Sequence, residues 1–168
     1  MKVVGIDPGT AACGYGIVHA SGGRLRAIDH GWWSTPAGER PELRLKTIYD
    51  GVAALVAEHL PDAVALEESF VGGDARIALS VGQARGAVLV AAAQAGIECT
   101  EYAPARVKQA VCGYGRAEKA QVQLMIKSIL KLDGPMTADA SDALAAAVCH
   151  ALRGRVLRAT ALRAGSRG

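Results

Sequence analysis

Four acidic residues stand where a folded chain could bring carboxylates together. Asp7 and Glu67 each follow a short apolar run, at residues 3–6 and 63–66. Asp139 and Asp142 are three residues apart, so a helix would place both on one face. Four converging carboxylates would carry four negative charges, which two divalent cations would neutralise, and hard oxygen ligands favour Mg²⁺ or Mn²⁺ over zinc. The pattern indicates phosphodiester hydrolysis at a two-metal site, where one ion activates a water and the other stabilises the leaving oxygen.

Each acid also has an ordinary structural interpretation. Asp7 could cap its own Pro8-Gly9-Thr10 turn. Asp139 could be an acid at a helix N-terminus, favoured there by the helix dipole, and Asp142 could simply be exposed. The occurrence of all four acids at the ends of predicted elements favours the shared site.

The elements that must position these acids alternate between strands and helices. Apolar runs bounded by turn formers predict strands at residues 3–6, 13–20, 24–33, 63–69 and 97–102. Helical spacing or composition predicts helices at residues 41–59, 75–95, 103–112, 117–132 and 138–152. The turn formers at residues 21–23 predict a hairpin, so the first three strands should form an antiparallel meander. We therefore expect an α/β fold with a five-stranded mixed sheet flanked by helices.

Charge is distributed unevenly along the chain. The net charge of the 168 residues is +3. Residues 1–103 hold 8 Lys/Arg and 12 Asp/Glu, whereas residues 104–168 hold 11 Lys/Arg and 4 Asp/Glu. A basic half predicts a polyanionic partner, and the alternative is a solvated basic face. The length fits one domain at residues 1–152, followed by a basic tail at residues 153–168 that we expect to be disordered.

Composition also bears on the compartment. The sequence contains no run of 18 or more uncharged apolar residues and no signal-peptide pattern at its start, so we expect a cytoplasmic protein with no membrane partner. Four cysteines, Cys13, Cys99, Cys112 and Cys149, form no C-x-x-C pair and are predicted to be small buried side chains. The alternative for Cys149 is a zinc site with His150 and a distant cysteine.

Three segments resemble the acidic motifs of the RuvC family. They are G-I-D-P-G-T at residues 5–10, A-L-E-E-S-F at residues 65–70 and A-D-A-S-D-A-L-A at residues 138–145. Residues 82–86, 107–109 and 117–123 are similar too, and the resemblance extends from residue 1 to about residue 152. It implies a ribonuclease H-like fold and a crossover (Holliday) junction endodeoxyribonuclease that acts in homologous recombination and DNA repair.

The resemblance assigns roles to individual residues. The four metal-binding acids of the family match Asp7, Glu67, Asp139 and Asp142, which implies two Mg²⁺ or Mn²⁺ ions per active site. Lys108 and Lys119 match basic residues that contact DNA near the cut, and Lys119 could stabilise charge developing on the phosphate. Glu68 is expected on the opposite strand face from Glu67, so it is not assigned to the metals.

Further DNA contacts are predicted around this centre. Phe70 matches a family aromatic that stacks on a base opened at the junction, and the alternative is an ordinary core Phe. Arg76 and Arg85 are candidates for phosphate contacts. Tyr114 lies between two glycines, next to Arg116, where both could reach the sugar–phosphate backbone. Packing within the loop is an equal alternative for Tyr114.

The implied substrate also predicts partners. An open four-way junction is two-fold symmetric, so matched nicks call for a homodimer, with the helix at residues 75–95 as its interface. The resemblance further implies work with the RuvA–RuvB branch-migration complex and a short preferred cleavage sequence. Two other functions compete. An actin-like phosphotransferase would share the first strand and its turn but needs two such lobes, and a non-catalytic DNA-binding module would not need all four acids.

Overall fold

The computed structural model describes residues 1–9, 11–68 and 74–165, with side chains up to residue 153. Five strands form one sheet in the order β3-β2-β1-β4-β5. β1 (Lys2–Pro8), β2 (Ala12–Ser21) and β3 (Arg24–Ser34) form the predicted antiparallel meander, whereas β4 (Ala63–Glu67) and β5 (Cys99–Tyr102) run parallel to β1. The predicted mixed five-stranded sheet is confirmed.

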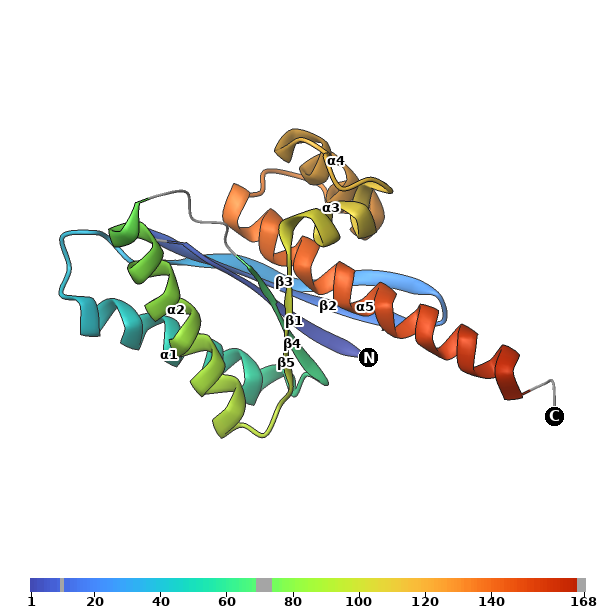
Figure 1. Cartoon of the computed structure of the whole chain (residues 1–168), viewed down its shortest axis with the longest axis horizontal. Helices are drawn as coiled ribbons and strands as arrows, with labels where there is room; N and C mark the ends of the chain where they lie inside the picture. Colours follow the sequence, from blue (N-terminus) through green and yellow to red (C-terminus); the bar gives the residue numbers. More distant parts are fainter. Residues whose placement is uncertain (10, 69–73, 166–168) are drawn as a thin grey trace.

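Helices cover both faces of this sheet (Figure 1). α1 (Pro41–His59) and α2 (Ala75–Gln94) lie on one face. α3 (Pro104–Cys112), α4 (Lys119–Leu130) and α5 (Ala138–Gly165) lie on the other. The alternating side chains of β1 serve the two layers in turn, because Val4 and Ile6 pack with α1 and α2 while Val3 packs with α5.

Three glycines allow α5 to lie unusually close to the sheet. A Cβ built on Gly5 would come within 3.0 Å of the Ala143 backbone, and one built on Gly14 would overlap the Asp139 carbonyl. Gly16, the cross-strand partner of Gly5, similarly leaves room for Leu144. Only glycine at these positions lets the first turns of α5 rest on the backbone of β1 and β2.

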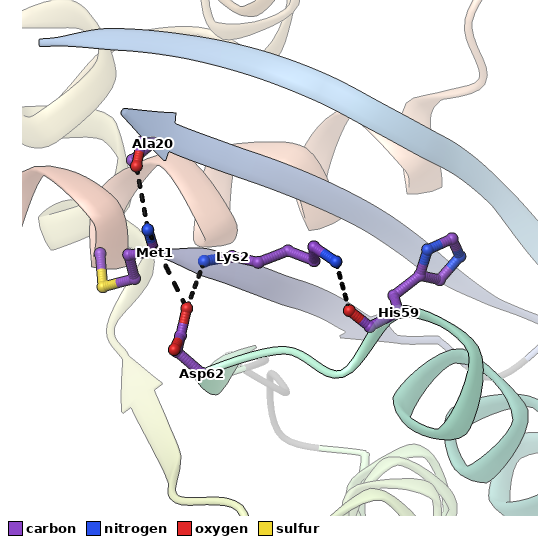
Figure 2. Close-up of polar contacts among 5 residues, drawn as sticks. All are labelled: Met1, Lys2, Ala20, His59 and Asp62. Carbon is purple, nitrogen blue, oxygen red and sulfur yellow. Dashed lines mark hydrogen bonds and ion pairs between the residues drawn. The ribbon is translucent and has the colours of Figure 1, made fainter. Parts of the chain in front are cut away.

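The start of β1 is held by polar contacts to two other segments (Figure 2). The Met1 ammonium group donates to the Ala20 carbonyl at 3.0 Å, and the Lys2 backbone N–H donates to Asp62 Oδ2 at 2.6 Å. The Lys2 ammonium group also donates to the His59 carbonyl at the end of α1. These contacts join β1 to β2 and to the α1–β4 connection. They therefore help to fix the position of β1, including its other end at Asp7.

The last helix was predicted to end at Leu152, before a disordered tail, but the structure continues α5 to Gly165. Ala, Leu and Arg dominate that stretch and are strong helix formers, so a helix can continue there without an amphipathic pattern. The domain boundary at residue 152 stays a prediction.

In the described part of the chain, α2 has the length and composition of a membrane span, with 28% of it buried, but core helices of soluble proteins meet the same test.

Replacing Gly5 by alanine should destabilise the fold. The added methyl group would meet the backbone of α5, which cannot move without disturbing its whole interface with the sheet. We expect Gly5→Ala to lower the free energy of unfolding by about 1–3 kcal/mol, measured by urea denaturation. Gly38→Ala is the matched control, since a Cβ there meets nothing within 4 Å. Equal stability of both variants would contradict the close approach.

Candidate active site

Asp7 and Glu67 lie side by side at one edge of the sheet. β1 and β4 are adjacent and parallel, with Ile6 opposite Leu66, so both strands end at the same edge. Strand alternation places Asp7 on the face of Val3, and Glu67 on the face of Ala65, which packs in the same core cluster. Both carboxylates therefore point to the layer that holds α5.

The first turns of α5 bring two more carboxylates to this edge. Gly14, the cross-strand partner of Asp7, packs against the backbone of Asp139. Asp142 lies one turn further along α5 and has a largely buried side chain, 19% exposed. The structure thus brings Asp7, Glu67 and Asp142 to one cavity, whereas Asp139 does not line it but is near enough for its charge to act on Asp7.

The fold disfavours negative charge on two of these carboxylates. Burial, reinforced by the charges of Asp142 and Asp139, raises the pKa of Asp7 to about 7, against the opposing effect of Lys119. Burial together with the charges of Asp7 and Asp142 raises the pKa of Glu67 to about 8, against Lys119 and Lys108. Raised carboxylate pKa values of this kind are typical of sites that bind or process charge.

A cavity of about 270 Å³ opens over this cluster. Its charged lining comes from five elements or their ends: Asp7, Glu67, Glu68, Lys108, Lys119 and Asp142. Lys119 Nζ donates to Asp142 Oδ2 at 3.1 Å, and this bond raises the pKa of the Lys119 ammonium group. Acids and cations line one cavity, which is the composition that a metal-assisted phosphate site requires.

Glu68, which was expected on the opposite strand face and was not assigned to the metals, also lines the cavity. β4 ends at Glu67, so strand alternation no longer governs the next residue. The Glu68 N–H donates to the Tyr102 carbonyl at 2.9 Å, and Glu68 lines the cavity with Glu67. Two consecutive acids at a strand end were the signal that sequence reasoning set aside.

The donor set has the chemistry of a site for hard divalent cations. Carboxylate oxygens are the ligands that Mg²⁺ and Mn²⁺ prefer. Burial first, and then the charges of neighbouring acids, raise the pKa values of Asp7 and Glu67. Among the described residues, however, no three His, Cys, Asp or Glu side chains lie close enough to hold one ion as they stand. Lys119 instead supplies the positive charge beside Asp142.

The zinc alternative at Cys149 gains no support from its surroundings. The Cys149 thiol donates to the Arg106 carbonyl at 3.8 Å, and His150 Nδ1 lies 3.0 Å from the Tyr102 hydroxyl. In the part of the chain that the structure describes, all four cysteines are free thiols, with Cys13 and Cys149 buried and Cys99 and Cys112 partly so.

Comparison with known proteins adds an independent observation. A sequence family described as "Crossover junction endodeoxyribonuclease RuvC" matches residues 3–150. The chain belongs to the RuvC family. The RuvC protein of Syntrophomonas wolfei is 52% identical over 151 residues, which cover 89% of this chain and 88% of that protein. The RuvC protein of Moorella thermoacetica is 51% identical over 152 residues, covering 90% and 91% of the two chains.

Solved structures agree with the sequence comparison. Thermus thermophilus RuvC in complex with a Holliday junction substrate has a TM-score of 0.87 and 39% identity, covering 93% of this chain and 96% of that one. The yeast mitochondrial Holliday junction resolvase Ydc2, at 11% identity and a TM-score of 0.65, shares the fold. The predicted ribonuclease H-like fold of a RuvC protein is confirmed.

The other residues predicted to contact DNA in this RuvC chain lie in varied surroundings. Arg85 is engaged by Glu101, with its Nε 2.9 Å from Glu101 Oε1, so it has a structural role on α2 and β5. Arg76 is exposed in the first turn of α2. Phe70 falls outside the described residues. The DNA contacts of all three stay predictions.

The loop before α4 holds the remaining two. Tyr114 is exposed, and its hydroxyl donates to Gln121 Oε1 at 2.8 Å. The DNA contacts of Tyr114 and Arg116 stay predictions. Gln121 also accepts from the Glu118 N–H at the start of α4. Arg116, between Tyr114 and Glu118 in the sequence, is exposed. Tyr114 thereby braces the segment that delivers Lys119 to the cavity.

The contributions of Asp7 and Glu67 should make the metal-free protein less stable at about pH 8 than at about pH 4. Their pKa values rise on folding, to about 7 for Asp7 and about 8 for Glu67. In the pH range between the ordinary carboxylate pKa values and these raised values, the folded chain binds more protons than the unfolded chain. Stability therefore falls as the pH rises through that window. Asp7→Asn removes one such group and should raise the free energy of unfolding by roughly 2 kcal/mol near pH 8.5.

The measurement is urea unfolding with EDTA present, at about pH 4 and about pH 8.5. Near pH 4 the advantage of Asp7→Asn should vanish, because Asp7 is then protonated in the folded wild type. Asp50→Asn, on the exposed surface of α1, is the control that should show no such change. An identical pH dependence of wild type and Asp7→Asn would refute the raised pKa.

Proposed function

We propose that this chain resolves four-way (Holliday) DNA junctions by hydrolysing a phosphodiester bond at the cavity of Asp7 and Glu67. The observation that carries the proposal is the meeting of carboxylates and lysines on one cavity. Membership of the RuvC family supports it, as does the match to Thermus thermophilus RuvC, which was solved with a Holliday junction substrate. The setting would be homologous recombination and DNA repair in the cytoplasm, alongside the RuvA–RuvB branch-migration complex.

The acids and lysines would divide the chemistry between them. Asp7, Glu67, Asp139 and Asp142 would hold two divalent cations, Mg²⁺ or Mn²⁺. Such ions would supply an activated water and stabilise charge on the leaving oxygen. Lys119 and Lys108, which line the same cavity, would donate to non-bridging oxygens of the scissile phosphate and offset the charge that develops there.

Lys119 would exchange partners when substrate binds. Its side chain is 80% exposed apart from the bond to Asp142, so it can swing from that carboxylate to a phosphate without losing buried contacts. Its release would free Asp142 to turn toward Asp7. In the absence of cations, Lys119 would therefore neutralise part of the charge of the acidic cluster. When cations bind, they would replace Lys119 in that role.

Asp7→Asn should abolish cleavage while preserving binding. The charges of both α5 acids, Asp142 and Asp139, raise the pKa of Asp7, so Asp7 is central to the cluster. On a synthetic four-way junction with Mg²⁺ or Mn²⁺, we expect the cleavage rate to fall by at least about 10²–10³-fold. Junction binding in EDTA, followed by gel shift, should stay within about twofold. Asp50→Asn is the matched control and should cleave like the wild type.

Substrate and metal controls in the same assay separate the alternatives. Paired nicks on the junction, absent on linear duplex and abolished by EDTA, are the expected result. Equal cutting of the duplex would instead indicate a general nuclease. Binding without cleavage under either metal would indicate a DNA-binding module.

We further propose a homodimer formed through α2. Leu79 and Val90 are 65% and 51% exposed, and they flank Gly82 and Gly86, where a Cβ would meet nothing within 4 Å. These four residues follow helical spacing and form one stripe on α2, called here the α2 stripe. Small residues within an exposed apolar stripe let a second helix approach closely, and a two-fold dimer would present one active site to each of two strands.

Charging the α2 stripe should produce a monomer. In the double variant Leu79→Glu and Val90→Glu, carboxylates would be buried without partners at the interface. Sedimentation velocity should show half the wild-type mass, and junction cleavage should yield single rather than paired nicks. Leu124→Glu is the matched control, because Leu124 is 68% exposed on α4, away from the stripe. A dimeric double variant would refute this interface.

A further inference from the structure

A second cavity, of about 750 Å³, lies at the other end of the sheet from the active site. Among its lining residues are Arg24, Leu25 and Arg26 of β3, Ile129 and Lys131 at the end of α4, and Leu152 of α5. We call this cavity the hairpin groove. Arg26 is opposite His19, which in turn is opposite Lys2, so the groove flanks the start of β1 whereas Asp7 is near the end of that strand. Along α5, Leu152 is about 15 Å beyond Asp142.

The cations of the hairpin groove form no ion pair with any side chain that the structure describes. Arg24, Arg26 and Lys131 are exposed, and none of them forms an ion pair with another described residue. By contrast, Arg40, Lys46, Arg85 and Lys119 each pair with a carboxylate. No Asp or Glu is among the described residues that line the groove. Its rim is therefore an electropositive surface left open to an anionic ligand.

The rest of the hairpin groove is apolar. Leu25, Ile129 and Leu152 are partly buried and pack against the core cluster that holds α5, while remaining accessible from the cavity. A phosphate backbone would satisfy the arginines and Lys131 but would leave this apolar surface in water. The groove favours a ligand that carries both carboxylates and apolar groups.

The position of β3 determines the shape of that ligand. β3 is an edge strand of the sheet, and strand alternation puts Leu25 on one face with Arg24 and Arg26 on the other. A chain lying extended along this edge would also present alternate side chains to the two faces. Acidic side chains would then meet the arginines while apolar ones enter the space between Leu25, Ile129 and Leu152.

We propose that the hairpin groove binds an extended segment of a partner protein in which acidic residues alternate with apolar ones. The segment would bind without blocking the active site, because the two cavities share no lining residue. The groove is thus a tether through which a partner could hold the nuclease while the other end of the sheet faces DNA.

The probe is a fluorescein-labelled ten-residue peptide of five Asp–Leu repeats, titrated with the full-length chain and followed by fluorescence anisotropy. Two comparison peptides replace either every Asp by Lys or every Leu by Ser. We expect the Asp–Leu peptide to bind at least tenfold more tightly than both. The double variant Arg24→Glu and Arg26→Glu should bind it at least tenfold more weakly than wild type.

The matched control is the double variant Arg40→Glu and Lys46→Glu, which makes the same charge change on exposed positions of α1 and its N-cap. It should bind the Asp–Leu peptide within about twofold of wild type. Junction cleavage by both double variants should equal that of wild type, and circular dichroism should show that both are folded.

Several results would overturn the proposal. Equal affinity for the Asp–Ser peptide would mean that the charge of the peptide alone is responsible for binding. An equal loss of affinity in both double variants would mean that only the net charge of the protein matters. Weaker junction binding in the Arg24→Glu and Arg26→Glu variant alone would identify nucleic acid as the occupant. Absence of saturable peptide binding would also refute the groove. Each of these outcomes leaves the proposed nuclease activity untouched, since cleavage is measured separately.

Discussion

The architecture depends on the close approach of α5 to the sheet. Gly5, Gly14 and Gly16 remove the side chains that would otherwise separate the helix from β1 and β2. Sheet and helix layers usually pack about 10 Å apart with side chains between them, and here the helix backbone rests on strand backbone. As a result the start of α5 is held directly over the end of β1. A shift of α5 by the width of a methyl group would move Asp139 and Asp142 away from Asp7.

This packing concentrates negative charge where solvent does not screen it. Burial and mutual repulsion raise the pKa values of Asp7 and Glu67, which is a cost to the folded state. The apolar clusters on both sides of the sheet, together with the contacts that fasten Met1 and Lys2, offset that cost. A rigid scaffold can hold repelling groups together, and the charge of Lys119 moderates the repulsion.

The two layers of helices leave different surfaces free. On one side, α2 buries only part of its apolar surface and exposes the α2 stripe, which suits a second copy of the chain. On the other side, α3 and α4 bring Lys108 and Lys119 to the active site, and the far end of α4 forms one wall of the hairpin groove. Substrate, second subunit and partner segment could therefore bind at three separate places on a small domain.

Local pattern by itself determined most of the fold and the four central acids. Apolar runs, turn formers and helical spacing report which residues are buried within one element, so the strands, the meander and the acids at element ends could be predicted from the sequence. Several limits differed from expectation: β4 stops at Glu67, β5 begins at Cys99, α4 spans only Lys119–Leu130, and α5 continues to Gly165. Such limits depend on neighbouring chain segments.

Contacts between elements distant in sequence were decided only by the tertiary structure. The inclusion of Glu68 in the cavity, the pairing of Lys119 with Asp142 and of Arg85 with Glu101, and the hairpin groove between β3, α4 and α5 leave no periodic signal in the sequence. They arise from how closely helices and sheet pack, and for α5 that distance depends on Gly5, Gly14 and Gly16. Residue types and spacing thus identified the chemistry, and packing determined which side chains share a site.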